Sequence, residues 1–319
     1  MKLQVFHRTH YAYASPVRES FNEARLQPTN ADGQICHSFS LTVDPGTQLN
    51  HYLDFQFNWV HLFDVNEPHS ALTVEATSVV TTTAEQVLPG DQPSTPLAEM
   101  DRSCGRLERC HDFLQTSRFV EPSPEAWRLG LDISHHGLTD TWQVAQAIMQ
   151  HIHREFAYLP MATNVHTHMR EVLRLKRGVC QDFAHVMLGV CRSLKIPARY
   201  VSGYLYNGPA DQLRGAQASH AWVEVYLPGQ GWHGLDPTNN GQPDERYVKI
   251  AVGRDYADVT PIKGTYRGTT DRKLSVDVLV TALDAVSARP ISRPILVCQM
   301  AGRRDQSSAA AEAAQDSSG

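Results

Sequence analysis

The chain has 319 residues, of which 41% are hydrophobic and 20% are charged, and its formal net charge is −5 with an isoelectric point near 6.3. This composition is typical of a globular protein that is long enough for two hydrophobic cores. Because the charge balance is acidic and no Lys/Arg run is longer than a pair, the chain offers no field for a polyanion, which excludes nucleic acid as an expected partner.

The N-terminal residues, M-K-L-Q-V-F-H-R-T-H, place charged and polar residues where a secretory signal needs an unbroken apolar run. No later segment approaches membrane-spanning length, so we expect a cytoplasmic protein without a membrane partner. The six cysteines are too few for a disulfide framework and include no C-x-x-C pair. We therefore expect free thiols, no zinc site and no cofactor.

The first part of the chain carries short segments rich in aromatic and β-branched residues, separated by turn-forming pairs such as Asp32-Gly33 and Glu67-Pro68. This pattern predicts an antiparallel β-sandwich domain over residues 1–84. It contains no chemistry-bearing motif, so we expect a structural role. Since strand edges invite pairing with another chain, a homo-oligomer is left open. The expected strand segments lie around Val5 to Tyr13 and at 37–43, 52–65 and 72–82.

Three further ranges complete the expected domain organisation. Residues 85–100 contain the run L-P-G-D-Q-P-S-T-P and predict a linker. Residues 101–285 are assigned to a core domain, and residues 286–319 to a C-terminal extension. From residue 301 onward Ala, Ser, Gln and charged residues predominate, and such a composition cannot bury enough apolar surface to order itself. The sequence therefore predicts a disordered tail.

The core domain shows helical spacing of apolar residues in its first half and strand spacing in its second half. Helices are expected at 107–114 and at 139–155, the second capped by Thr139 or Asp140, and both should pack against a third helix that begins at Cys180. The pattern predicts an α+β fold with helices on an antiparallel sheet. Strands are expected at 198–206, 219–227, 232–236 and 273–283, while 246–256 fits a strand or a helical turn.

Cys180 is the first candidate for a catalytic residue. It lies in R-G-V-C-Q-D-F-A-H, where apolar residues begin to recur at helical spacing, so it should occupy a helix N-terminus. There the unpaired N–H groups and the helix dipole favour a thiolate, which is the nucleophilic form of cysteine. Most cysteines are small buried hydrophobes, so Cys180 needs partners elsewhere in the chain before it can be called a nucleophile.

His220 and Asp236 can supply those partners if the hairpin between them has the right register. In S-H-A-W-V-E-V-Y-L, alternation places His220 opposite to the aliphatic face of its strand, and Asp236 ends the following strand in G-L-D-P-T-N. An odd loop that pairs Leu227 with Gly231 places both side chains on one face, about 7–8 Å apart along a diagonal. An even loop would place them on opposite faces, so the hypothesis requires an odd loop or a bulge.

These three residues fit the needs of thiol catalysis. A thiol requires a base within about 3 Å, and the base requires a carboxylate that fixes its tautomer and stabilises the imidazolium. We assign these roles to Cys180, His220 and Asp236. The backbone N–H of Cys180 is the expected first oxyanion donor and the Tyr158 hydroxyl the second, although a half-buried core tyrosine is an equally ordinary role. Trp222 shares the face of His220 and is expected to line the substrate cleft, with a core position as its alternative.

Other polar residues receive structural interpretations. His185 lies more than one helical turn after Cys180 and is expected to make a structural hydrogen bond. Asp182, in the first helical turn, is expected to cap the helix or interact with its dipole. The remaining histidine pairs, such as His151 and His153, stand at i,i+2 and would point to different sides of a helix, so we expect no metal site.

The segments R-G-V-C-Q-D-F-A-H, A-S-H-A-W-V-E-V-Y and G-L-D-P-T-N resemble the three motifs of the transglutaminase-like superfamily, which has a papain-like Cys-His-Asp core. The opening H-Y-A-Y-A-S-P-V and the later A-V-G-R-D-Y-A-D-V resemble bacterial members of that superfamily with an N-terminal β-domain. The resemblance covers most of residues 1–285. It implies a papain-like transglutaminase core that acts through a thiol acyl-enzyme.

One residue departs from the animal transglutaminases, which have Trp directly after the nucleophile where this chain has Gln181. Cross-linking of protein glutamines to lysines is therefore not implied. The resemblance to the bacterial group implies hydrolysis of a peptide, protein or small amide substrate by a protease or amidase, with transamidation also open. Hydrolysis and transfer differ only in whether water or an amine resolves the acyl-enzyme. The alternative is a catalytically idle scaffold or binding module with the same fold.

Overall fold

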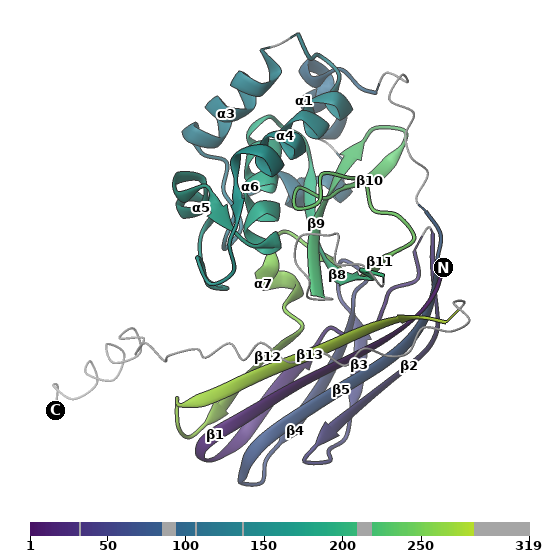
Figure 1. The fold of residues 1–319 in the computed structure, drawn as a ribbon, viewed down its shortest axis with the longest axis vertical. Coiled ribbons are helices and arrows are strands. Elements are labelled where there is room, and N and C mark those ends of the chain that lie inside the picture. The colour runs from purple at the N-terminus through teal and green to yellow at the C-terminus, as the bar shows by residue number, and fades with distance from the viewer. Residues whose placement is uncertain (32, 85–93, 106, 136, 209–218, 284–319) are drawn as a thin grey trace, which may run out of the picture.

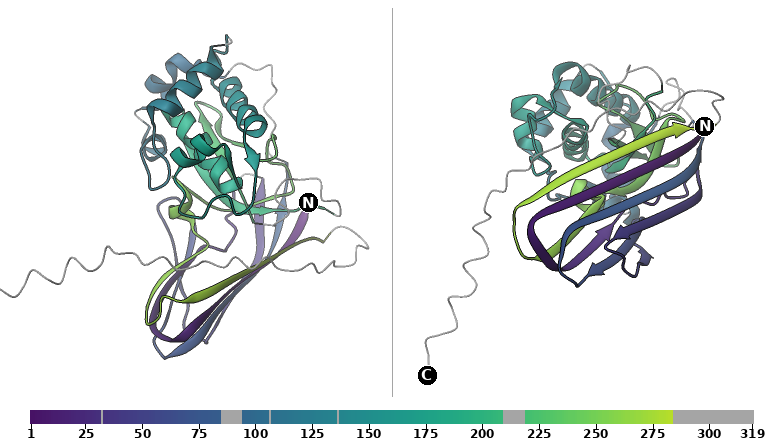
Figure 2. Two further views of the ribbon diagram at one scale, coloured as in Figure 1. Left: turned by 60° about the vertical axis from the view of Figure 1, so that its left-hand side comes forward. Right: turned by 60° about the horizontal axis from the view of Figure 1, so that its bottom comes forward.

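The computed structural model describes residues 1–31, 33–84, 94–105, 107–135, 137–208 and 219–283. Figures 1 and 2 show a helix-rich core above a domain of long, strongly twisted strands. The fold is an α+β core, with helices on an antiparallel sheet, joined to an N-terminal sheet domain, as the sequence predicts. The expected C-terminal extension and its disordered tail, and residues 85–93 of the expected linker, lie outside the described residues.

The N-terminal sheet is organised around one long strand, β1 (Lys2–Ala24). Its first half pairs with β5 (His69–Thr82) and its second half with β4 (Trp59–Val65), with a register irregularity between the halves. The strand order is β2-β5-β1-β4-β3, where β2 is Gln34–Asp44 and β3 is Asn50–Leu53. Along β1 buried and exposed residues alternate, as expected for strands that bury one face.

Two late strands complete this sheet, which corrects the expected domain boundaries. β12 (Ile262–Arg267) and β13 (Arg272–Ala282) both pair antiparallel with β1, so the strand expected at 273–283 belongs to the β-domain and not to the core. At the other boundary, residues 94–100 are part of the core rather than a linker. They form a 3₁₀ turn, Leu97–Glu99, whose first N–H donates to the Thr139 carbonyl.

The helices of the core surround α6 (Cys180–Ser193), whose residues from Asp182 to Arg192 are all buried. α4 (Thr141–Glu155) is capped by Asp140, whose carboxylate accepts a hydrogen bond from the Gln143 N–H, so the expected cap is confirmed. None of the described helices is long and apolar enough to cross a membrane. The other helical segments are α1 (Met100–Cys104), α2 (Glu108–His111), a 3₁₀ turn (Asp112–Leu114), α3 (Pro124–Ser134), α5 (Met169–Leu175) and α7 (Tyr256–Val259).

A four-stranded antiparallel sheet with the order β10-β9-β8-β11 supports these helices. One face of β9 presents aliphatic residues that pack in the same hydrophobic cluster as α6. The opposite face is covered as well, because all residues of β9 after Ser219 are buried. The strands are β8 (Ala198–Leu205), β9 (Ser219–Leu227), β10 (Gly231–Leu235) and β11 (Tyr247–Gly253), and a separate parallel pair joins β6 (Ala157–Tyr158) to β7 (Arg177–Gly178).

Candidate active site

Cys180 is the first residue of α6, and two neighbouring residues explain why the helix starts there. The Asp182 carboxylate accepts hydrogen bonds from the Val179 N–H at 2.8 Å and from the Thr163 hydroxyl at 2.6 Å. Gly178 makes this cap fit, since a Cβ at that position would lie 2.5 Å from Asp182 Oδ2. The capping role expected for Asp182 is confirmed, and the cap holds Cys180 at the positive end of the helix.

The β9–β10 hairpin has the register that the hypothesis requires. Leu227 pairs with Gly231 and Val223 with Leu235, so a loop of odd length joins the strands. His220 and Asp236 therefore share a face, and the His220 Nε2–H donates to Asp236 Oδ2 across 2.7 Å. Because the carboxylate binds Nε2, the other ring nitrogen, Nδ1, is left for the Cys180 sulfur, and Cys180 lies near enough to contribute to the raised pKa of His220.

The Asp236 carboxylate is 0% exposed and accepts several further hydrogen bonds. Tyr247 donates its hydroxyl to Oδ2 at 2.9 Å, and the Asn239 side chain donates to the same oxygen at 2.8 Å. The backbone N–H of Thr238 donates to Oδ1 at 2.8 Å. Such a set of donors satisfies a buried charge and fixes the plane of the carboxylate.

Charge and burial act in opposite directions on this pair. Burial disfavours the imidazolium of His220, but the charge of Asp236 and the hydrogen bonds with Asp236 and Cys180 outweigh it and raise the pKa of His220 to about 10. Burial alone would raise the pKa of Asp236, but the His220 charge and the donors around the carboxylate lower it. At neutral pH the site thus holds an imidazolium–carboxylate pair beside a cysteine that is partly exposed.

Tyr158 lies close to this group. Its strand β6 pairs with β7, so that Tyr158 is opposite Gly178, two residues before Cys180. Burial raises the pKa of the Tyr158 phenol, and the negative charges of Cys180, Asp182 and Asp236 raise it further. The phenol is therefore a protonated hydrogen-bond donor at neutral pH, as an oxyanion donor must be.

Trp222 does not have the position expected for a cleft residue. Its side chain is only 1% exposed and lies in a hydrophobic cluster with Tyr247 on the covered face of the sheet. Its ring stacks behind His220 at a centroid distance of 6.3 Å. The sequence shows the alternation of β9 but not that the second face of the sheet is covered, so the expectation of an open cleft at Trp222 is corrected to a supporting position in the core.

His185 has the structural role expected for it. The ring is fully buried, stacks on Phe119 at 5.5 Å, and accepts a hydrogen bond from the Tyr256 N–H through Nε2. Burial lowers its pKa to about 3, so it is neutral at pH 7. Within the described part of the chain, no group of three or more His, Cys, Asp or Glu side chains is placed to hold a metal ion.

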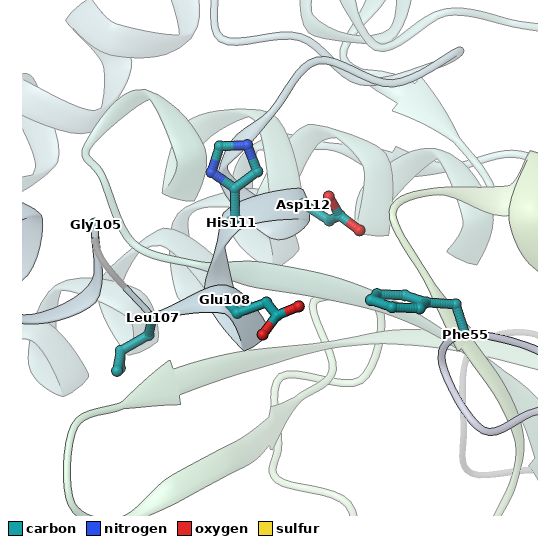
Figure 3. Close-up of a pocket in the computed structure, with 6 residues that line it drawn as sticks. All are labelled: Phe55, Gly105, Leu107, Glu108, His111 and Asp112. Carbon is teal, nitrogen blue, oxygen red and sulfur yellow. The ribbon is translucent and has the colours of Figure 1, made fainter.

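A hollow of about 370 Å³ lies elsewhere, between the β3–β4 loop and α2. Figure 3 shows Phe55 pointing from the β-domain toward the carboxylates of Glu108 and Asp112. None of the predicted site residues lines this hollow. It is therefore separate from the cluster of Cys180, His220 and Asp236.

Two residues of the site, Tyr247 and Asn239, are absent from the sequence-based prediction. Asn239 stands three residues after Asp236 in D-P-T-N-N, where an Asx side chain next to a strand end is a recognisable turn signal. Tyr247 has no comparable signal, because its contact with Asp236 depends on how β11 pairs with β8.

A papain-like sheet and helix that bring together a cysteine at a helix N-terminus, a strand histidine and a buried aspartate define the class of transglutaminase-like proteins. The family model described as "Transglutaminase-like superfamily" matches residues 131–237, which include all three side chains. The model described as "Bacterial transglutaminase-like N-terminal region" matches residues 3–81. The chain belongs to the transglutaminase-like superfamily, in its bacterial form with an N-terminal β-domain.

Three similar proteins illustrate the range of the family. An uncharacterized protein from Mycobacterium leprae is 36% identical over 88% of this chain and 99% of its own length. A protein-glutamine gamma-glutamyltransferase from Pseudomonas aeruginosa is 33% identical over 43% of this chain and only 22% of its own length. The crystal structure of a candidate cysteine protease from Cytophaga hutchinsonii shares the fold, with a TM-score of 0.70 over 92% of this chain and 94% of that one, at 23% identity.

Proposed function

We propose that the protein is a cysteine-dependent acyl-transfer enzyme whose main reaction is hydrolysis of a peptide bond or another amide bond. The observation that carries the proposal is the buried His220–Asp236 pair, bonded at 2.7 Å, beside the partly exposed Cys180. An imidazolium next to the sulfur stabilises the thiolate by its charge, and the carboxylate keeps the ring charged and oriented.

The proposed reaction has two steps. In the first, the Cys180 thiolate attacks the amide carbonyl, and His220 gives its proton to the departing amine, which leaves a thioester on the enzyme. In the second, His220 takes a proton from water as its oxygen attacks the thioester, and the acid and the Cys180 thiolate are released, which restores the thiolate beside the His220 imidazolium. The N–H of Cys180 and the Tyr158 hydroxyl are the proposed donors to the oxyanion in both steps.

Transamidation is the same chemistry with an amine in place of water in the second step. The name of the P. aeruginosa relative, a gamma-glutamyltransferase, favours this acceptor, but that relative matches less than half of this chain. Digestion of an unbiased peptide library by the purified protein, with added primary amine competing with water, tests which product forms. A ligated amine product as the main species would contradict hydrolysis as the main reaction.

The nucleophile is tested by Cys180→Ala. We expect this variant, folded as judged by circular dichroism, to lose all hydrolysis of the peptide library and all labelling by a thiol-reactive amide analogue. Undiminished activity would remove the assignment.

Iodoacetamide labelling separates an enzyme from an idle scaffold. At about pH 6 a thiolate held by an imidazolium reacts, whereas an ordinary thiol does not. Cys36 is a control in the same molecule, because burial raises the pKa of its thiol. We expect peptide mass spectrometry to find Cys180 alkylated and Cys36 intact. Equal protection of both residues would favour the catalytically idle scaffold.

The cellular setting is part of the proposal. We propose a cytoplasmic enzyme that acts on a peptide, protein or small amide and binds neither nucleic acid nor membranes. The acidic net charge of −5 supports the exclusion of nucleic acid. Fractionation of the producing cells tests the location, and recovery of the protein in the membrane fraction would contradict it.

A further inference from the structure

The buried carboxylate of Asp236 is held from the side of the core that faces the β-domain. Tyr247 donates to Asp236 Oδ2 at 2.9 Å, and its ring packs against the His220 ring at 5.9 Å and the Trp222 ring at 5.4 Å. Tyr247 is the first residue of β11, which is the outermost strand of the core sheet. The position of β11 therefore sets where the tyrosine hydroxyl meets the carboxylate.

The β-domain makes hydrogen bonds to the backbone of β11 and of the residues just before it, on both sides of Tyr247. Two residues before it, the Glu245 carbonyl accepts a hydrogen bond from the Thr82 hydroxyl at the end of β5. Two residues after it, the Gln34 side chain of β2 makes two hydrogen bonds with the Lys249 backbone, one to the carbonyl and one from the N–H, both at 2.8 Å. In Figure 1, β11 lies on the side of the core next to the β-domain strands.

We propose that the N-terminal β-domain is a positioning element of the active site: Thr82 and Gln34 fix the chain around Tyr247, and Tyr247 orients Asp236 and, through it, His220. This inference rests on the proposed function, because it gives the β-domain a role only if His220 and Asp236 act in catalysis. It requires no contact between the β-domain and a substrate. A catalytic group must be held within about 0.5 Å of its productive position. The residues that contact and support that group commonly determine whether it stays there.

Asn58, in the loop before β4, offers a matched control because it binds the same strand, β11. Like Gln34, it makes two side-chain hydrogen bonds to the backbone of one β11 residue, here Val252, both at 2.8 Å. It too is buried and belongs to the β-domain. Val252 lies five residues beyond Tyr247, so the Asn58 pair attaches the domain to the core but does not flank the tyrosine. The two side-chain amides make the same pair of hydrogen bonds with the β11 backbone, but at different positions along the strand.

The experiment compares four variants of the full chain: Tyr247→Phe, Gln34→Ala, Thr82→Val and Asn58→Ala. The probe is iodoacetamide, and the readout is the alkylation rate of Cys180 at about pH 6 divided by the rate at about pH 9.5. At the higher pH a thiol ionises without help from a base, so the ratio separates the contribution of the His220–Asp236 pair from a general increase in the exposure of Cys180.

The titratable groups that face Asp236 are His220 from β9, Tyr247 from β11 and Tyr158 from β6.

We expect Tyr247→Phe to lower this ratio about tenfold, as the loss of one hydrogen bond to a charged group would. Gln34→Ala and Thr82→Val should each lower it about threefold, and Asn58→Ala should leave it within about twofold even if its melting temperature falls as far as that of Gln34→Ala. Thr82→Val removes the hydroxyl but keeps the shape of the side chain, so it tests the same role if Gln34→Ala does not fold.

Equal ratios for Gln34→Ala and Asn58→Ala, or a wild-type ratio for Tyr247→Phe, would overturn the inference. These outcomes are distinct from failure of the proposed function. If wild-type Cys180 is not alkylated at pH 6 at all, the enzyme assignment fails. If it is alkylated and all four variants behave alike, only the positioning role of the β-domain fails.

Discussion

Two buried histidines, His220 and His185, lie in the core of this protein and have opposite properties. His220 donates to a buried carboxylate, and its pKa is raised to about 10. His185 is packed between aromatic rings and accepts a hydrogen bond from the Tyr256 N–H, and its pKa is lowered to about 3. Both rings are at least nine-tenths buried, so burial alone does not decide the protonation state.

The difference between the two regions lies in what faces the ring. Burial disfavours the charged form of both histidines, and at His220 the Asp236 carboxylate, with a further contribution from Cys180, reverses this effect. At His185 the charged groups that act on the ring are cationic, Arg192 and His168, and they lower its pKa further. A histidine in a protein core is thus a candidate base only when a carboxylate accompanies it, as Asp236 accompanies His220.

The strongest way to break this contrast is Asp236→Asn. Without the carboxylate, burial opposes the imidazolium and only Cys180 still favours it, so the pKa of His220 should fall and the ring should become neutral at pH 7, as His185 is. We expect kcat to fall about 10³- to 10⁴-fold and alkylation of Cys180 at about pH 6 to disappear. The measurement is the pH profile of both rates, and an unchanged alkylation profile would show that Asp236 does not control His220.

His185→Phe tests the other half of the contrast through stability. Because the folded-state pKa of His185 lies near 3 and the unfolded value near 6.5, its neutral form contributes stability that is present above about pH 6.5 and is lost as pH falls toward 3. Wild-type protein should lose up to about 1.4 kcal/mol per pH unit more than the variant in this window. Urea unfolding at pH 7, 6 and 5 measures the difference, and parallel curves would contradict the assigned shift.

At pH 7 the same variant should be less stable than wild type by about 1 kcal/mol, because the Tyr256 N–H loses its acceptor. Its alkylation ratio at Cys180 should stay within about twofold of wild type. A large loss of alkylation would indicate that His185 acts on the nucleophile and would remove the distinction between the two regions.

Among the substitutions of groups that contact Asp236, Asn239→Ala should have the smallest effect. Its side chain donates to Asp236 Oδ2 at 2.8 Å, but Tyr247 and His220 donate to the same oxygen, so the carboxylate remains well satisfied. We expect a decrease of about threefold in kcat with KM unchanged, measured on a peptide from the library. A loss as large as that of Asp236→Asn would show that Asn239 is itself part of the reacting group.

The sequence predicts the central geometry of the site because that geometry depends on local rules. The start of α6 follows from helical spacing after Gly178, and the meeting of His220 with Asp236 follows from the parity of one hairpin, which the register confirms. These features involve residues that are close in the chain or joined by a short turn. Period and turn length are sufficient to derive them.

The features that escape prediction depend on long-range pairing. The alternation at 273–283 predicts a strand but cannot say that its partner is β1, almost the whole chain away. Trp222 is buried because the second face of the core sheet is covered, which no property of β9 reveals. Tyr247 reaches Asp236 for a related reason, since the register of β11 on β8 places it there.

The placement of β12 and β13 in the first domain has a consequence for synthesis of the chain on the ribosome. The edge of β1 from Leu3 to Tyr13 is closed by β13, so the first strand waits for the last of the described strands while the helix-rich core is translated between them. Until then this edge offers unpaired backbone groups to any extended segment nearby. The nascent protein therefore has its greatest risk of mispairing before residue 272 emerges, and a chain that stops short of it would carry the complete Cys180–His220–Asp236 cluster beside an incomplete β-domain.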